Sequence, residues 1–254
     1  TYQRPDLFLS ELTANVINEF DYFLKTAHKC NHNTATKYLK NFKKITRIAL
    51  SNGWMSKDPF ATIRFHLKDV DMAFLTEDEL KRLMALEIDI PRLKRVRDIY
   101  LFSCFTGLAF SDTKELTYEN IEELKGKKWI VTRRHKTKQL CRIPMLPPAL
   151  AIMEKFKSDP YCVNSGRVLP VPSNQKMNAY LQEIADLAGI KKHLSTHTAR
   201  HTFATTVTLS NNISIEVVAK MLGHTSINMT KKYARVVDDY ICKDMKKIEG
   251  MYAM

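Results

Sequence analysis

Residues near the C-terminal end of the sequence combine a possible nucleophile with groups that bind anions. His197 and Arg200 are three residues apart, and His224 follows a Leu-Gly pair. Tyr233 comes nine residues after His224, next to lysines. Because helical residues three apart are neighbours, His197 and Arg200 can contact one anion together. An arginine binds two phosphate oxygens at once and a histidine adds a donor, so this spacing indicates a phosphate site beside a tyrosine.

The same segment also permits a metal-site interpretation, because His193, His197 and His201 recur at intervals of four. The zinc-protease pattern requires Glu directly after its first histidine, but Thr198 follows His197, and no cysteine or acid stands nearby. We therefore expect no metal and no other cofactor. Taken alone, the segment is also consistent with histidines that only pack or face solvent.

The charge balance favours a polyanionic partner. The chain has 254 residues, with 40 Lys+Arg against 27 Asp+Glu, and its formal net charge is +13. Lysine and arginine that neutralise phosphates release condensed counterions, so nucleic acid is favoured over a basic surface kept only for solubility. The apolar runs are too short to span a bilayer. The five cysteines are widely spaced and contain no C-x-x-C, which is typical of reduced thiols.

Hydrophobic periodicity predicts a mainly α protein with a small antiparallel β-sheet. We expect a helical domain over residues 1–70 and a second domain over residues 71–254, with the boundary near residues 66–75. Thr76 and Glu79 have the spacing of a capping box that opens a helix. Two strands are expected at residues 129–132 and 141–144. Further helices are expected at residues 96–105, 147–156, 176–188, 198–209, 215–222 and 228–233.

A second basic feature lies on the helix expected after Asn33 or Thr34, either of which can cap it. Its cations stand opposite its apolar residues with no acid between them. This pattern favours contact with phosphates over a merely solvated face. The cations are Lys37, Lys40, Lys43, Lys44 and Arg47.

The motifs together resemble the catalytic block of the tyrosine recombinases, the integrase family of DNA strand-exchange enzymes. The resemblance rests on THTARHTFAT at residues 196–205 and on MLGH at residues 221–224, followed by Tyr233. FTGLAFSD at residues 105–112 resembles the family's T-G-L-R-x-S-E/D turn. Lys136-Thr137, between the two strands, resembles the hairpin that carries the catalytic lysine. Residues 6–66 resemble the helical core-binding (SAM-like) domain by pattern only.

The resemblance implies a reaction and a role for each residue. Tyr233 would attack a scissile phosphate to give a 3′-phosphotyrosyl link and a free 5′-hydroxyl, without ATP or metal. Arg200 and His224 would bind the phosphate, and His197 would handle the tyrosine proton. Lys136 would protonate the leaving oxygen. Two further residues have supporting roles, an acidic residue that orients its neighbours and a structural histidine behind the arginine: Asp112 and His201.

One position departs from the family pattern. Ala109 stands where the first catalytic arginine belongs, and alanine cannot bind phosphate. Loss of one donor from a preorganised site costs roughly 10²- to 10³-fold in rate, so another cation should compensate. The T-G-L-A variant resembles a subset of conjugative-transposon integrases. The candidate replacements are Arg97, on the helix before this turn, and two hairpin residues otherwise expected to bind DNA, Arg133 and Arg134.

Arg97 is the replacement that the sequence favours. It lies about three helical turns before Ala109 on an otherwise apolar element, where an unpaired charge would be costly. The alternative is that Arg97 forms a salt bridge with a neighbour such as Asp98 or Glu115.

The family resemblance also implies partners. These are double-stranded attachment sites on DNA, a homotetramer that passes through a Holliday junction, and an accessory DNA-bending protein. Residues 236–254 would dock on an adjacent protomer, or else fold back on their own domain. An additional arm-binding domain would precede Thr1, and the protein would act in the cytoplasm on the nucleoid, with no membrane contact. Two alternatives are a type IB topoisomerase and a DNA-binding regulator weakened by Ala109.

Overall fold

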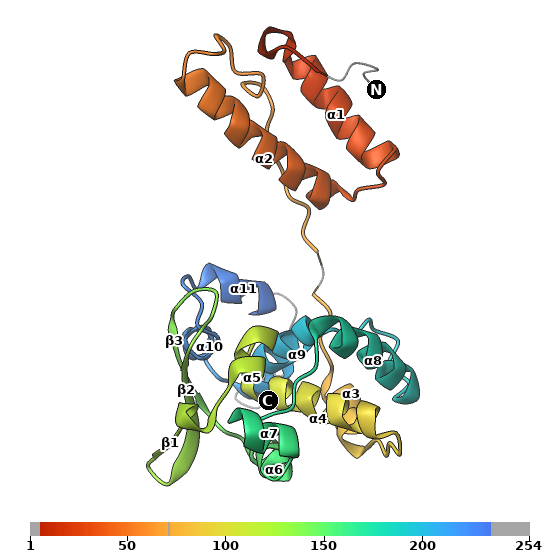
Figure 1. Ribbon diagram of the computed structural model, residues 1–254, viewed down its shortest axis with the longest axis vertical. Coiled ribbons are helices and arrows are strands. Elements are labelled where there is room, and N and C mark those ends of the chain that lie inside the picture. The colour runs from red at the N-terminus through yellow and green to blue at the C-terminus, as the bar shows by residue number, and fades with distance from the viewer. Residues whose placement is uncertain (1–5, 71, 235–254) are drawn as a thin grey trace, which may run out of the picture. The chain divides into compact units, whose positions relative to one another are not determined.

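The computed structural model describes residues 6–70 and 72–234 and divides the chain into two compact units, residues 1–71 and 72–254 (Figure 1). The mainly helical fold with a small antiparallel sheet, which the periodicity predicts, is confirmed. Over the described ranges, no helix has the length and apolar character that crossing a membrane requires.

The first unit is built on two long helices. It contains the short 3₁₀ turn η1 (Leu9–Glu11), α1 (Ala14–Thr26) and α2 (His32–Ser51). The N-cap of α2 is Asn31, whose side chain accepts a hydrogen bond from the Thr34 N–H at 2.8 Å, and not Asn33 or Thr34. Ile17, Leu39 and Phe60 form the buried core between the helices and the segment that follows them.

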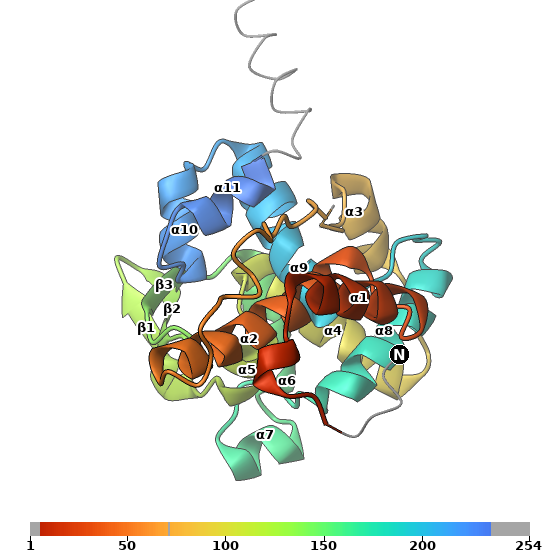
Figure 2. The same cartoon turned by 90° about the horizontal axis from the view of Figure 1, so that it is seen from above.

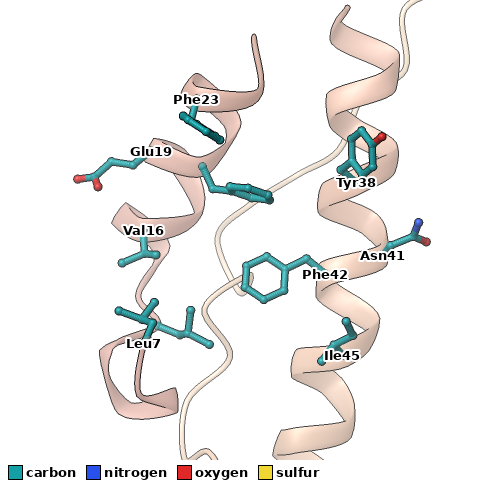
Figure 3. Close-up of a pocket in the computed structure, with 10 residues that line it drawn as sticks. Leu7, Val16, Glu19, Phe23, Tyr38, Asn41, Phe42 and Ile45 are labelled. Carbon is teal, nitrogen blue, oxygen red and sulfur yellow. The ribbon is translucent and has the colours of Figure 1, made fainter. Parts of the chain in front are cut away.

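An apolar groove of about 520 Å³ runs between α1 and α2. Figure 3 shows the Phe42 ring pointing into the space between the two helices, whereas Glu19 points away from it. Ile45 lines the groove and remains 65% exposed, although periodicity places it on the apolar face. The apolar residues of α2 are therefore shared between a buried face and an open one.

The second unit is a helical body that carries the sheet at one side. Its core is α4, which is buried on all sides from Asp98 to Thr106, as its nearly continuous apolar sequence requires. The predicted capping box of Thr76 and Glu79 is confirmed at the start of α3. The α-helices described in the second unit are α3 (Glu77–Ala85), α4 (Pro91–Thr106), α5 (Phe110–Glu115), α6 (Pro147–Phe156), α7 (Pro160–Ser165), α8 (Asn174–Leu187), α9 (Thr196–Thr202), α10 (Ile215–Leu222) and α11 (Asn228–Ala234).

The sheet has the antiparallel order β1-β2-β3. The strands are β1 (Ile121–Leu124), β2 (Lys127–Arg133) and β3 (Leu140–Pro144). Ile130 of β2 lies opposite Ile143 of β3, and both are buried against the helical body. Strand β1 was not predicted, because it is mostly exposed and contains two glutamates, which are uncommon in strands.

Helix α9 lies in the middle of the second unit, with the sheet and α10 on one side and α3 and α8 on the other (Figures 1 and 2). It continues directly into the π-helical segment η3 (Phe203–Thr208) and a 3₁₀ turn, η4 (Leu209–Asn211), where the sequence predicted one helix. The Thr208 hydroxyl donates to the carbonyls of Phe203 and Ala204, both at 2.9 Å, at this change of winding. π-Helical turns of this kind often adjoin functional sites.

Candidate active site

Arg200 is held by the carbonyls at the ends of two helices. It lies on α9, which Ser195 caps, and only 3% of it is exposed. Its guanidinium donates to the carbonyl of Gly107, after α4, and to that of Leu222, the last residue of α10. Three separate segments therefore fix the direction of this guanidinium.

Both helix ends need glycine at these positions. Gly107 and Gly223 have φ of +67° and +61°, in the left-handed region. A Cβ on Gly107 would lie 2.4 Å from the Phe203 ring, and a Cβ on Gly223 would lie 2.5 Å from Cys141 Sγ and 2.7 Å from Arg134 Cδ. The T-G-L motif thus lets the end of α4 approach Phe203 of η3, and the L-G-H motif lets the end of α10 approach Cys141 of β3 and Arg134.

His224 and Tyr233 lie against this arginine. Arg200 donates to His224 Nε2 at 3.2 Å, so the imidazole proton is on Nδ1, which donates to Thr230 Oγ1 at 2.7 Å. The rings of His224 and Tyr233 are nearly parallel, 13° apart, with centroids separated by 6.3 Å. Thr230 and Tyr233 both belong to α11, so this helix provides the tyrosine and also orients the histidine.

Arg134 brings a second buried guanidinium to this cluster. Its guanidinium donates to Asp112 Oδ2 at 3.3 Å and to the Leu222 carbonyl at 3.2 Å, the same carbonyl that Arg200 contacts. Asp112 Oδ1 also accepts a hydrogen bond from the backbone N–H of His135 at 2.9 Å, which fixes the carboxylate. Two buried guanidinium groups therefore lie side by side. Asp112 holds that of Arg134, which fits the orienting role that the family resemblance implies for this residue.

Arg97, the replacement favoured by the sequence, lies elsewhere, so that prediction is wrong. Its guanidinium donates to Asp98 Oδ1 at 2.8 and 3.0 Å and to the Leu86 carbonyl, and Lys155 pairs with the other oxygen of Asp98. Ten residues of helix separate it from Gly107, which is about 15 Å. The alternative, a salt bridge to Asp98, is what the structure shows. Proximity along an apolar helix did not specify which face the arginine occupies.

The hairpin turn brings Lys136 to the rim of the site. Lys136 is exposed between β2 and β3, and the neighbouring Thr137 hydroxyl donates to the Gly223 carbonyl at 3.2 Å. Arg133 is also exposed, and its guanidinium donates to the Lys138 carbonyl at 3.4 Å and not to the buried cluster. Of the cations on this hairpin, Arg134 is buried in the site and Lys136 lies at its edge.

Three aromatic rings follow one another beside Arg200. The His197 and His201 centroids are 4.6 Å apart, and the His201 and Tyr233 centroids are 5.4 Å apart. His197 is exposed, whereas His201 is 7% exposed. His201, expected to pack behind Arg200, therefore contacts both His197 and the tyrosine.

Burial and the two arginines determine the charge of the cluster. Burial, aided by the charges of Arg200 and Arg134, lowers the pKa of His224 to about 4. Partial desolvation of the His197 ring, which keeps an exposed edge, acts with the same two charges to lower the pKa of His197. Lys136 contributes to the lowered pKa of His197, which places its charge near that ring. Burial raises the pKa of Tyr233, and the charge of Arg200 opposes this. At neutral pH the site thus holds two cations, neutral imidazoles and a protonated phenol.

The buried histidines make stability depend on pH. Burial also lowers the pKa of His201 to about 4, against 6.5 when unfolded, as for His224. The unfolded chain therefore binds more protons than the folded chain between these two pKa values. The contribution of these histidines to the free energy of unfolding is fully present above pH 6.5 and is lost as the pH falls toward 4. We expect each of these two histidines to lower the free energy of unfolding of the protein by on the order of 1–2 kcal/mol at about pH 5.

Denaturant titrations near neutral pH and at about pH 5 measure this loss. His201→Asn should flatten the pH dependence relative to the wild type, whereas His193→Asn, at an exposed histidine, should leave it unchanged. An equally steep dependence in His201→Asn would contradict the assignment.

Most cations predicted on α2 are exposed, but two contact aromatic rings, and the exposed Lys40 lies over the Phe65 ring at 6.0 Å. Lys43 is half-buried, donates to the Phe60 carbonyl at 3.4 Å and lies over the Phe60 and Phe65 rings at 5.7 and 5.8 Å. The exposed cations are Lys37, Lys40, Lys44 and Arg47. The predicted docking segment, residues 236–254, lies outside the described residues.

Comparison with known proteins agrees with this fold. Residues 73–239 match the Phage integrase family and residues 1–77 match the Phage integrase SAM-like domain. A tyrosine recombinase of Thermosipho africanus is 25% identical over 230 residues, covering 88% of this chain and 78% of that protein. The tyrosine recombinase XerA of Pyrococcus furiosus is 31% identical over 178 residues, covering 66% and 58%.

Solved structures show the same fold at lower identity. A lambda integrase (75–356) dimer bound to a COC' core site is 19% identical, with a TM-score of 0.73, over 91% of this chain and 82% of that one. The Tn1549 transposon integrase in complex with a circular intermediate DNA is 17% identical, with a TM-score of 0.70, over 94% and 86%. The protein is thus a tyrosine-type site-specific recombinase. It belongs to the phage integrase family.

Proposed function

We propose that this protein cuts and rejoins double-stranded DNA through a covalent link to Tyr233 and exchanges strands through a Holliday junction. The observation that carries the proposal is a buried tyrosine beside Arg200 and His224, in a cluster that also holds a second buried guanidinium. Such a cluster is suited to the extra negative charge of a pentacoordinate phosphate.

Each bond change in this reaction can be assigned to a residue. The Tyr233 oxygen attacks phosphorus, its proton passes to His197, and the bond to the 5′-oxygen breaks. Lys136 gives a proton to the departing 5′-oxygen. Arg200 and Arg134 stabilise the charge on the phosphoryl oxygens. The neutral state of His197 and the exposed position of Lys136 support these roles.

Arg134 takes the role of the arginine missing at Ala109 in this proposal. Both guanidinium groups donate to the Leu222 carbonyl, so they can contact the same phosphate. The alternative of a binding-only regulator was based on the arginine missing at Ala109. A second arginine able to contact the phosphate weakens that alternative.

Assembly and partners follow the same proposal. The lambda integrase structures include a tetramer bound to a Holliday junction. We propose a corresponding tetramer on two attachment sites of a mobile element, assisted by a DNA-bending protein and acting at the nucleoid.

The direct test offers the protein two duplexes that carry the junction sequences of the genetic element encoding it. Recombination predicts four-way junctions and then exchanged duplexes on a gel. Relaxation of a supercoiled plasmid without any exchange would favour the topoisomerase alternative. Tight binding with neither product would favour a regulator and would overturn the proposal.

The exposed cations of α2 should contribute to DNA affinity through phosphates. Replacing Lys37, Lys40, Lys44 and Arg47 by glutamine should reduce the slope of log affinity against log salt by about 0.9 for each phosphate that these side chains neutralise. Lys43→Gln is the matched control, because Lys43 is held by Phe60 and should affect stability more than salt dependence. Fluorescence anisotropy at several salt concentrations measures the slope. An unchanged slope in the fourfold variant would show that this face does not contact DNA.

A further inference from the structure

The chain enters the second unit along the helix that carries the candidate catalytic residues. His201 Nδ1 donates to the Ala73 carbonyl at 3.1 Å. The Leu75 N–H donates to Thr202 Oγ1 at 2.9 Å, and the Thr206 hydroxyl donates to the Leu75 carbonyl. The first residues of this unit, which follow directly from the first unit, are thus tied to α9 and η3 by side chains.

His201 differs from the two threonines because its other side faces the nucleophile. A carbonyl only accepts, so the imidazole proton is on Nδ1 and Nε2 carries the lone pair. The ring contacts the His197 ring, with centroids 4.6 Å apart, and the Tyr233 ring, with centroids 5.4 Å apart.

Tyr233 therefore has a histidine on two sides. His224 stacks on it and is fixed by Arg200 and Thr230, all within the phosphate-binding cluster. His201 contacts it at a steeper angle, 55°, and is fixed by the backbone of the entering chain. The tyrosine ring is thus positioned by the phosphate site and also by the segment that leads in from the first unit.

We propose that His201 is a positioning residue for Tyr233, and that it couples the position of the nucleophile to the chain entering at Ala73. This inference rests on the proposed function, in which Tyr233 is the nucleophile. The hydrogen bond to Ala73 sets the plane of the His201 ring, and the ring in turn limits where Tyr233 can lie. Misplacement of a reacting group by about 1 Å can cost about 10²-fold in rate, so such a contact is sufficient to affect cleavage.

Two His201 variants separate the hydrogen bond from the ring. His201→Phe keeps a ring against Tyr233 but cannot donate to Ala73, whereas His201→Asn keeps a donor near the Nδ1 position but has no ring. Thr202→Val is the control. It removes a hydrogen bond to the same entering segment, at Leu75, but leaves both histidine rings against Tyr233 in place. Single-turnover cleavage of nicked duplexes carrying the element's junction sequences gives the rate, and anisotropy gives the affinity.

We expect both His201 variants to cleave about 10- to 100-fold more slowly at saturating DNA, with affinity within about twofold of wild type, and to shift the pH–rate profile. Thr202→Val should lower stability and leave the saturated rate and the profile unchanged. If all three variants lose rate in proportion to stability, or if neither His201 variant loses rate, the positioning role is wrong.

A second readout does not require activity. Ultraviolet titration, taken as the difference between each protein and its Tyr233→Phe counterpart, reports the ionisation of Tyr233 in the free protein. His201→Phe should shift this titration and Thr202→Val should not. If the wild type forms no covalent adduct, the proposed function fails, and an unshifted titration in His201→Phe would separately overturn the positioning role.

Discussion

We expect Arg134→Ala to slow covalent cleavage of DNA about 10²- to 10³-fold, because it removes one preorganised donor from the charge that develops on phosphorus. Arg134 is buried and oriented by Asp112 before DNA arrives, so its contribution to the transition state should exceed its contribution to binding. Affinity for the duplex should therefore change much less than the rate. Arg134→Lys should recover only part of the rate, since lysine lacks the planar pair of donors.

Arg97→Ala is the matched control for this prediction. It removes an arginine of similar burial from Asp98, about 15 Å along α4 from the site. We expect it to lower the free energy of unfolding while leaving the cleavage rate of the folded protein unchanged. Single-turnover cleavage of nicked duplexes, with stability measured in parallel, distinguishes the two variants. Equal rate losses for Arg97→Ala and Arg134→Ala would contradict the assignment of Arg134.

Tyr233→Phe should abolish the covalent adduct and leave DNA binding intact. The substitution removes only the phenolic oxygen, so the ring can keep its contacts with His201 and His224. Denaturing gels detect the adduct, and anisotropy measures the affinity.

The control is Tyr240→Phe, which changes the next tyrosine in the sequence, outside the described residues. It should form the adduct at the wild-type rate. An adduct that persists in Tyr233→Phe and disappears in Tyr240→Phe would move the nucleophile to Tyr240.

Local sequence was sufficient to predict most helices and the candidate cluster on α9 and α11. Helices α6 and α10 coincide with the predicted ranges 147–156 and 215–222. Pro147 begins α6, whereas Ser214 caps the start of α10 and Gly223 ends it. The order of His197, Arg200, His224 and Tyr233 also identifies the family, which the comparisons confirm. Both results depend on spacing that can be read within a short stretch of chain.

The position of Arg134 depends on contacts that spacing does not encode. Its partners Asp112 and Leu222 are 22 and 88 residues away, and the strand register that brings them together is set by the whole sheet. A signal was nonetheless present, since Arg134 stands two residues before Lys136, on the turn expected to approach the phosphate. Spacing alone favours Arg97, because it cannot distinguish an arginine paired with the adjacent Asp98 from one that faces the site.

His201 shows a similar limit. Its helical spacing from His197 predicts a neighbouring ring, but nothing in the sequence indicates that the Ala73 carbonyl lies on its other side, 128 residues away. The exposed apolar residues of α2, such as Ile45, show another limit, because a helix in a small two-helix unit buries a narrower face than its apolar pattern suggests.

Identifying the residue that carries DNA after cleavage tests the central claim most directly. A trapped adduct is digested with nuclease and with a protease that cuts after lysine, and the nucleotide-bearing peptide is sequenced by mass spectrometry. Cleavage after Lys232 leaves Tyr233 and Tyr240 on one peptide, within which fragmentation separates them. We predict that the nucleotide remnant is on Tyr233. A remnant on any other residue, or tight DNA binding without an adduct, would contradict this account.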